Sequence, residues 1–198
     1  MKKINLVFVF ILSACTVQGK AIYSQGVISG WEHNGFKNTK NGVEILFSVE
    51  NRDYITLDET LVGITTKDRK SGINSAIGKK PFIVKVELKT TNEYVYIKQN
   101  AKLILDGKEY MPLKVEKGID RVLSGRVKSE VLSPDYDGFM LIDNALDGID
   151  HNWLWLEFDI ATPHPNQNFT LFLDVKNDES YETLEANFAA KVISIHHH

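Results

Sequence analysis

Five aspartates lie within one stretch of the chain, SPDYDGFMLIDNALDGID, which is also rich in turn-forming residues. Asp135, Asp137 and Asp143 supply carboxylate oxygens, and Gly138 follows the Asp-x-Asp pair. Calcium binds several hard oxygen ligands on a turning backbone, so these three aspartates form a candidate calcium site, the one cofactor that the sequence indicates. The stretch departs from the EF-hand pattern because Asn144 stands where a bidentate glutamate is needed. The alternative is an acidic surface loop whose Asp and Gly residues make turns.

A second group of side chains surrounds two tryptophans in the stretch NWLWLEFD. If its leucines face a core, alternation places Trp153, Trp155 and Glu157 together on the opposite face of one strand. A hairpin through residues 161–168 would bring Phe172 onto that face, opposite Glu157. Aromatic rings flanked by carboxylates suit a sugar or a partner protein, so these four residues form a candidate binding platform. In the alternative, a loop or the C-terminal segment covers the rings, which then form a second small apolar cluster.

The motifs of several common enzyme classes are absent. The sequence contains no GxSxG, no HExxH, no phosphate-binding loop and no dinucleotide-binding glycine pattern. His33, His151 and His164 lie far apart in turn-like sequence, which indicates ordinary loop histidines. A hydrolase would need two of the scattered carboxylates to converge at about 5 to 9.5 Å. We therefore expect a protein that is not an enzyme, with a carboxylate-dependent hydrolase as the remote alternative.

The only cysteine, Cys15, stands directly behind a short apolar run. Two lysines precede the run, residues 4–12, which is too short to span a bilayer but has the length of an export signal. The stretch Leu12-Ser13-Ala14-Cys15 resembles the lipobox of bacterial lipoproteins. The resemblance implies that the chain is cut before Cys15, whose thiol and new amine then carry acyl chains. A plain secretory signal that contains a cysteine is the alternative.

Acylation would convert a soluble domain into an anchored one. Each buried CH₂ contributes about 0.8 kcal/mol, so three acyl chains would hold the protein on a membrane essentially permanently. The residue after the cysteine is Thr16, and in enteric bacteria an aspartate there favours the inner membrane. The same resemblance therefore implies an outer-membrane location for this chain. The domain beyond Cys15 has no other cysteine, so no internal disulfide can form in the oxidising compartment.

Length and charge narrow the class of protein further. Removal of residues 1–14 leaves 184 residues with 21 Lys and Arg against 26 Asp and Glu, a net charge of −5. This length fits one large domain or two small ones. The hydrophobic content of 43% is ample for a packed core, and the mild acidity argues against nucleic acid as a partner.

Period-two alternation dominates the chain and predicts half-buried strands. About ten strands without intervening helices predict an all-β protein, an antiparallel immunoglobulin-like sandwich. Asp106-Gly107 predicts a type I′ turn between two of them. The segment YETLEANFAAKVISI fits a helix or a strand, and its β-branched end favours a closing strand. The expected strands lie near 22–29, 43–50, 60–67, 82–89, 93–98, 121–128, 154–160, 169–175 and 181–195, and residues 102–115 are expected to form a hairpin.

The domain organisation follows from these strands. We expect a signal peptide at 1–14, a lipidated tether at 15–20 and one sandwich domain at 21–195. Two smaller sandwiches divided near 116–120 are the alternative. The stretches AKLILDGKEYMPLKV and FTLFLDV resemble immunoglobulin-like strands of exported bacterial proteins. The function that fits best is a non-enzymatic, lipid-anchored module that binds or assembles an envelope protein. A glycan-binding lipoprotein that uses the tryptophans is the alternative.

Overall fold

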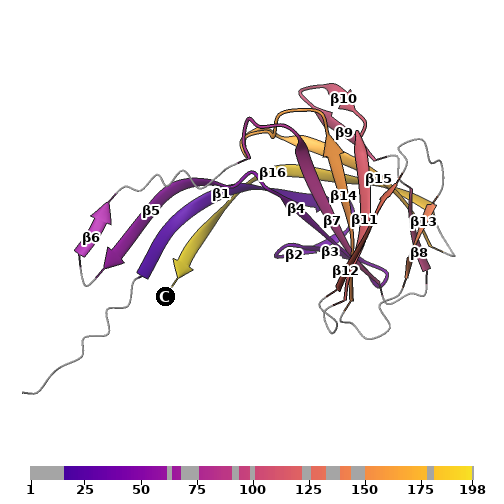
Figure 1. Cartoon of the computed structure of the whole chain (residues 1–198), viewed down its shortest axis with the longest axis horizontal. Helices are drawn as coiled ribbons and strands as arrows, with labels where there is room; N and C mark the ends of the chain where they lie inside the picture. Colours follow the sequence, from indigo (N-terminus) through magenta and orange to yellow (C-terminus); the bar gives the residue numbers. More distant parts are fainter. Residues whose placement is uncertain are drawn as a thin grey trace, which may run out of the picture.

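The chain folds into two antiparallel β-sheets (Figure 1). The computed structural model describes residues 16–61, 64–67, 76–90, 94–98, 101–121, 126–132, 139–143, 150–177 and 181–197. Every regular element in these ranges is a strand, and none of them contains a helix long and apolar enough to cross a membrane. The predicted all-β sandwich is confirmed, although the described residues form sixteen strands instead of about ten.

Sheet I contains nine strands, including the first and the last along the chain. They are β1 (Thr16–Ile28), β5 (Asp53–Leu61), β6 (Ile64–Lys67), β8 (Tyr94–Lys98), β9 (Lys102–Leu105), β10 (Lys108–Tyr110), β13 (Phe139–Asp143), β15 (Phe169–Asn177) and β16 (Tyr181–His197). Their order is β10-β9-β15-β16-β1-β5-β6, with β8 pairing both β15 and β13. The ambiguous last segment is therefore a strand, as its β-branched residues predict.

Sheet II contains seven strands in the order β12-β11-β14-β7-β4-β3-β2. They are β2 (Glu32–Asn34), β3 (Lys37–Lys40), β4 (Val43–Val49), β7 (Phe82–Thr90), β11 (Lys114–Arg121), β12 (Arg126–Leu132) and β14 (Asp150–Phe158). The alternative domain boundary at 116–120 falls inside β11, which pairs with β12 on one side and β14 on the other. The hydrogen bonds of sheet II therefore hold together the segments before and after residues 116–120.

The core lies between the sheets and follows the predicted alternation. Sheet II buries Phe82, Val84 and Val86, and sheet I buries Leu171 and Leu173. The rings of Phe169 and Phe188, neighbours in sheet I, stack at 4.3 Å between centroids. Phe82 of sheet II meets Phe169 edge-on at 5.3 Å, which links the two layers. Burial of these side chains is the main favourable term for the sandwich.

The predicted hairpin between residues 154–160 and 169–175 is wrong. β14 pairs with β7 and β11 in sheet II, whereas β15 pairs with β16, β9 and β8 in sheet I. The segment 161–168 carries the chain from one sheet to the other. Its backbone is held by other loops: Thr162 N–H donates to Lys79 O at 2.8 Å, and Asn51 Nδ2 donates to Pro163 O at 3.1 Å. The apolar faces of β14 and β15 therefore enter the core from opposite sheets.

Residues 16–20, which the sequence predicts as a tether, instead begin β1. Thr16 pairs with Thr60 of β5, and Val17 pairs with both Glu59 and His197. The first half of β1, with β5, β6 and the end of β16, extends away from the sandwich as an arm (Figure 1). The C-terminal end of β16 lies beside the start of β1 at the tip of this arm.

Two asparagine side chains bond to the backbone of β1 beyond the residues where β1 pairs with β5. Asn51 Oδ1 accepts a hydrogen bond from Ser24 N–H at 3.1 Å. Further along the same edge, Asn38 Nδ2 donates to Gly26 O at 3.2 Å, and Asn38 Oδ1 accepts from Ile28 N–H at 2.9 Å. These side chains take the place of a neighbouring strand, because buried backbone groups need partners. Asn38 comes from β3, so the same contacts tie sheet I to sheet II.

Candidate functional site

The two tryptophans lie on the outer face of sheet II, as alternation along β14 predicts. In the sheet register, Trp155 lies between Glu116 of β11 and Lys85 of β7, and Trp153 lies next to Gly118 of β11. We call this surface the tryptophan face. Its residues are Lys85, Glu116, Gly118, Val131, Trp153, Trp155 and Glu157.

The two rings differ sharply in exposure. Trp153 is 7% exposed, whereas Trp155 is 41% exposed. Trp153 is buried because its indole lies across the bare backbone of Gly118, where an added Cβ would sit 2.0 Å from the ring. Lys85 Nζ lies 5.8 Å from the centroid of the Trp153 ring, at the distance of a cation–π contact. Trp153 is therefore a support within the face, and Trp155 is its exposed aromatic residue.

Trp153 also positions Trp155. The two ring centroids are 5.6 Å apart and the planes are inclined by 46°. This contact, together with the flanking strands, restricts the rotamers open to the Trp155 side chain. An aromatic ring ordered before binding loses less conformational entropy when a partner covers it.

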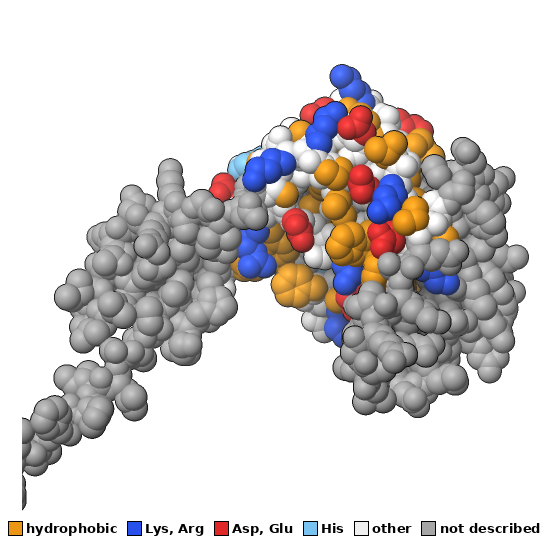
Figure 2. Space-filling model, in the orientation of Figure 1, with side chains coloured by type: hydrophobic (Ala, Val, Ile, Leu, Met, Phe, Trp, Pro, Cys, Tyr) orange, Lys and Arg blue, Asp and Glu red, His pale blue; other side chains and the backbone are white. Residues whose placement is uncertain are grey.

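Charged groups and one apolar side chain surround Trp155. Lys114 Nζ lies 3.1 Å from Glu116 Oε2, and Val131 on β12, which pairs with Glu116, is 59% exposed. On the other side of Trp155, Lys85 of β7 pairs with it in the sheet. Figure 2 shows apolar side chains interspersed with charges of both signs over the described surface. The arrangement has the composition of a protein interface, with an aromatic centre and a polar rim.

The sequence interpretation missed four residues of this face: Lys85, Glu116, Gly118 and Val131. Gly118 belongs to the stretch that indicated a domain boundary, whereas in the structure it leaves room for the Trp153 ring. A glycine inside a strand often marks a close approach of this kind, so that signal was present in the sequence.

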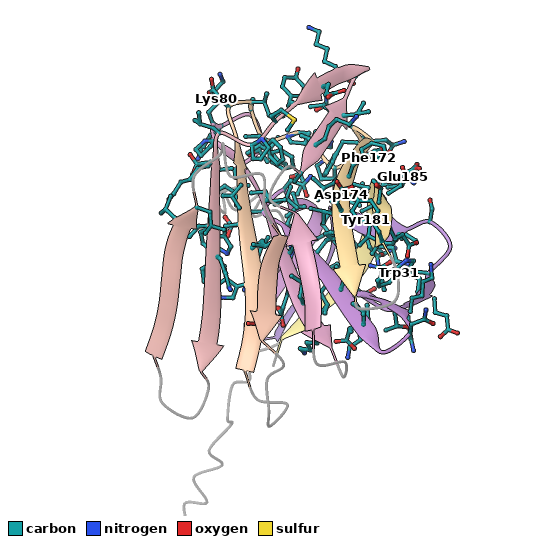
Figure 3. The ribbon with its side chains drawn as sticks, turned by 90° about the vertical axis from the view of Figure 1, so that its right-hand side faces the viewer. Trp31, Lys80, Phe172, Asp174, Tyr181 and Glu185 are labelled. Atoms are coloured by element: carbon teal, nitrogen blue, oxygen red, sulfur yellow. The ribbon has the colours of Figure 1, made fainter. Side chains whose placement is uncertain are left out.

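Phe172 does not join the tryptophan face. It lies on the outer face of sheet I, where it pairs with Glu185 and where Lys102 Nζ is 5.3 Å from its ring centroid. Figure 3 shows Phe172 near Asp174 and Glu185 along β15 and β16. The predicted pairing of Phe172 with Glu157 is wrong because the chain changes sheets between these residues.

The candidate calcium ligands are only partly within the described chain. Asp135 and Asp137 lie outside the described residues, and Asp143 is the last residue of β13. In the part of the chain that the structure describes, no group of His, Cys, Asp and Glu residues is arranged to hold a metal ion. The calcium site stays a prediction, and Cys15 likewise lies outside the described residues.

The prediction of loop histidines is wrong for His33, which lies in β2, and for His151, which lies in β14. His33 and His164 make separate polar contacts. His33 Nε2 lies 2.9 Å from Gln25 Nε2, and His164 Nε2 lies 3.3 Å from Asp53 Oδ2.

Comparisons of the chain with protein-family models, curated proteins and solved structures find no match. The geometry of the tryptophan face and the N-terminal sequence are therefore the features that indicate a function.

Proposed function

We propose that this protein is a lipid-anchored envelope lipoprotein that binds a partner protein through the tryptophan face, without catalysing a reaction. The observation that carries the proposal is the exposure of Trp155, at 41%, in the middle of a strand on a packed sheet. The two-sheet sandwich supports an immunoglobulin-like character for the domain, which is part of the same proposal.

A partner protein fits this face better than a glycan does. Burial of Trp153 leaves Trp155 as the one tryptophan ring of the face that a ligand can cover widely. Tryptophan is enriched among residues that dominate protein interfaces, especially at the centre of a patch whose rim excludes water. Lys85, Glu116 and Glu157 supply such a rim and offer both signs of charge to a partner.

The anchor follows from the lipobox resemblance around Cys15. Acylation there would place lipid one residue before β1, which begins at Thr16. The arm would then lie next to the membrane, and the tryptophan face would project from it into the envelope. Thr16 supports an outer-membrane location by the same resemblance.

Affinity capture of the lipidated protein from detergent-solubilised envelopes tests both parts. We expect Trp155→Ala to weaken capture of the partner by about 2 kcal/mol or more, if Trp155 is the central anchor. Its folding stability should change by less than about 1 kcal/mol, because the substitution removes exposed area. Phe172→Ala is the matched control, since it removes a partly exposed ring from the other sheet and should leave capture unchanged.

Either of two results would contradict the proposal. Equal recovery of the same proteins by wild type and Trp155→Ala would remove the tryptophan face as the binding site. Cys15→Ser should abolish lipid attachment, so a Cys15→Ser protein that matures and partitions with membranes as wild type does would refute the anchor.

A further inference from the structure

A recess of about 420 Å³ lies on sheet I, beside the turn that joins β9 to β10. The turn forms one wall, and the start of β15 and the middle of β16 form the others. Asp106 and Gly107 shape the turn with positive φ angles of 50° and 71°, which confirms the predicted type I′ geometry. The volume falls within the range of small-molecule sites, about 300 to 1,000 Å³.

The polar part of the recess is held in place by a hydrogen-bond network. Thr170 Oγ1 donates to Asn187 Oδ1 at 2.9 Å. The Asn187 amide in turn donates to Glu185 Oε1 at 3.1 Å and to Ser29 Oγ at 3.3 Å. These bonds fix the Asn187 amide and leave lone pairs on the Thr170 hydroxyl to accept a hydrogen bond. The Asn168 amide and the Asp106 carboxylate complete the polar lining.

Apolar groups line the rest of the recess. Ile104 and Ala189 contribute aliphatic surface, and the stacked rings of Phe169 and Phe188 lie beneath them. A sugar ring has the complementary character, with hydroxyl groups at its edge and C–H groups across its faces. Amide, hydroxyl and carboxylate groups can each bond to those hydroxyls, while the aliphatic walls cover the C–H surface.

The charge of the lining selects against anions. The lining includes one carboxylate, Asp106, and its residues include no Lys, Arg or His. Glu185, which bonds to Asn187, adds a second negative charge close by. The lining residues themselves therefore offer no cation to a phosphate or an acidic sugar, and the Asp106 carboxylate repels an anion.

We propose that this recess binds a neutral sugar unit. The site lies on sheet I, whereas the tryptophan face lies on sheet II, so the two surfaces can be tested separately. The proposal does not depend on protein binding through Trp155.

Saturation-transfer NMR and titration on the full-length protein provide the test. The lipidated protein should be held in lauryldimethylamine oxide micelles, because a maltoside detergent would itself compete for the recess. The probes are methyl glucoside, methyl galactoside and N-acetylglucosamine, with glucuronate as the anionic comparison. We expect at least one neutral probe to bind and glucuronate to bind about tenfold more weakly or not at all.

Neighbouring alanines on β16 give matched variants. Ala189 lines the recess, whereas Ala190 is also exposed but points to the opposite face of the strand. Ala189→Phe should fill the recess and weaken sugar binding at least about tenfold. Asn168→Ala should also weaken it, by removing a lining amide. Ala190→Phe and Trp155→Ala should bind the sugar as wild type does.

Three results would overturn the proposal. They are failure of every neutral probe to bind wild type, equal binding by Ala189→Phe and wild type, and glucuronate binding as tight as that of the neutral probes. Loss of sugar binding in Trp155→Ala with retention in Ala189→Phe would instead place the sugar on the tryptophan face. Thermal melts of each variant establish that the compared proteins are folded.

Discussion

Substitution of Gly118 by alanine tests the packing that holds the tryptophan face together. The added Cβ would lie 2.0, 2.3 and 2.4 Å from three atoms of the Trp153 ring. Ordinary contacts between carbon atoms are about 3.5 to 4.0 Å, so the indole would have to move by more than 1 Å. Lys85 and Trp155 flank the ring, and they would be displaced with it.

The expected cost follows from overpacking. Inserting a methyl group into a well-packed site costs about 1 to 3 kcal/mol, and a rigid indole over a backbone should lie in the upper part of that range. Without the ring above it, the same substitution should stabilise the protein by about 0.4 to 1 kcal/mol. Alanine restricts the unfolded chain more than glycine, and Gly118 has no positive φ that would oppose a side chain. Gly118→Ala should therefore lower the free energy of unfolding if the Trp153 ring lies over Gly118, and raise it if the ring lies elsewhere.

Urea denaturation of a double-mutant cycle measures the coupling. Trp153→Ala alone should destabilise by about 3 to 5 kcal/mol, because it removes a buried indole. Once the ring is gone, Gly118→Ala should cost nothing or stabilise, so the double mutant should be more stable than the two single effects predict. Additive free energies of unfolding, or stabilisation by Gly118→Ala alone, would refute the packing of Trp153 on Gly118.

Two further substitutions test the packing and hydrogen bonding around β1. Asn38→Ala should destabilise by about 1 to 3 kcal/mol for each backbone group it leaves unpaired, and these groups include Ile28 N–H and Gly26 C=O. Asn38→Asp keeps the acceptor but replaces the Nδ2 donor with a carboxylate oxygen that faces Gly26 O in a fully buried site, so in a urea melt at neutral pH it should cost at least as much. A loss below about 1 kcal/mol in both variants would contradict this role. Burial raises the pKa of the Tyr23 hydroxyl above its ordinary 10.0, with the Arg52 charge opposing part of the rise. The Tyr23 contribution is therefore fully present below pH 10 and is lost as pH rises through the folded-state pKa, so Tyr23→Phe should flatten the alkaline loss of stability.

The sequence predicts the faces of individual strands well, because alternation is a local property. Phe82, Val84 and Val86 are buried together, and Trp155 faces outward, as period two requires. The type I′ turn at Asp106-Gly107 is predicted for the same reason, since two residues suffice to set it.

Partners of the strands are harder to predict because they depend on residues far apart in the chain. The residues of 161–168 alone do not show whether this segment closes a hairpin or crosses from one sheet to the other. The crossing depends on contacts with Asn51 and Lys79, which are distant in the sequence. The role of Asn38 similarly depends on where β5 leaves β1, over a separation of many residues. The burial of Trp153 could have been inferred from Gly118 only with the β11–β14 register in hand.

The pairing of β1 with β16 has a consequence for how the chain folds. Residues 17–28 of the first strand pair with residues 186–197 of the last, so the centre of sheet I joins segments separated by nearly the whole sequence. Such pairing carries a large loop-closure entropy and slows folding. If the chain is exported as proposed, β1 would cross the membrane first and would stay unpaired on that side until β16 had followed it. Its alternating, β-branched sequence would need protection from aggregation over that interval, so we expect this protein to depend on a chaperone more during secretion than after it.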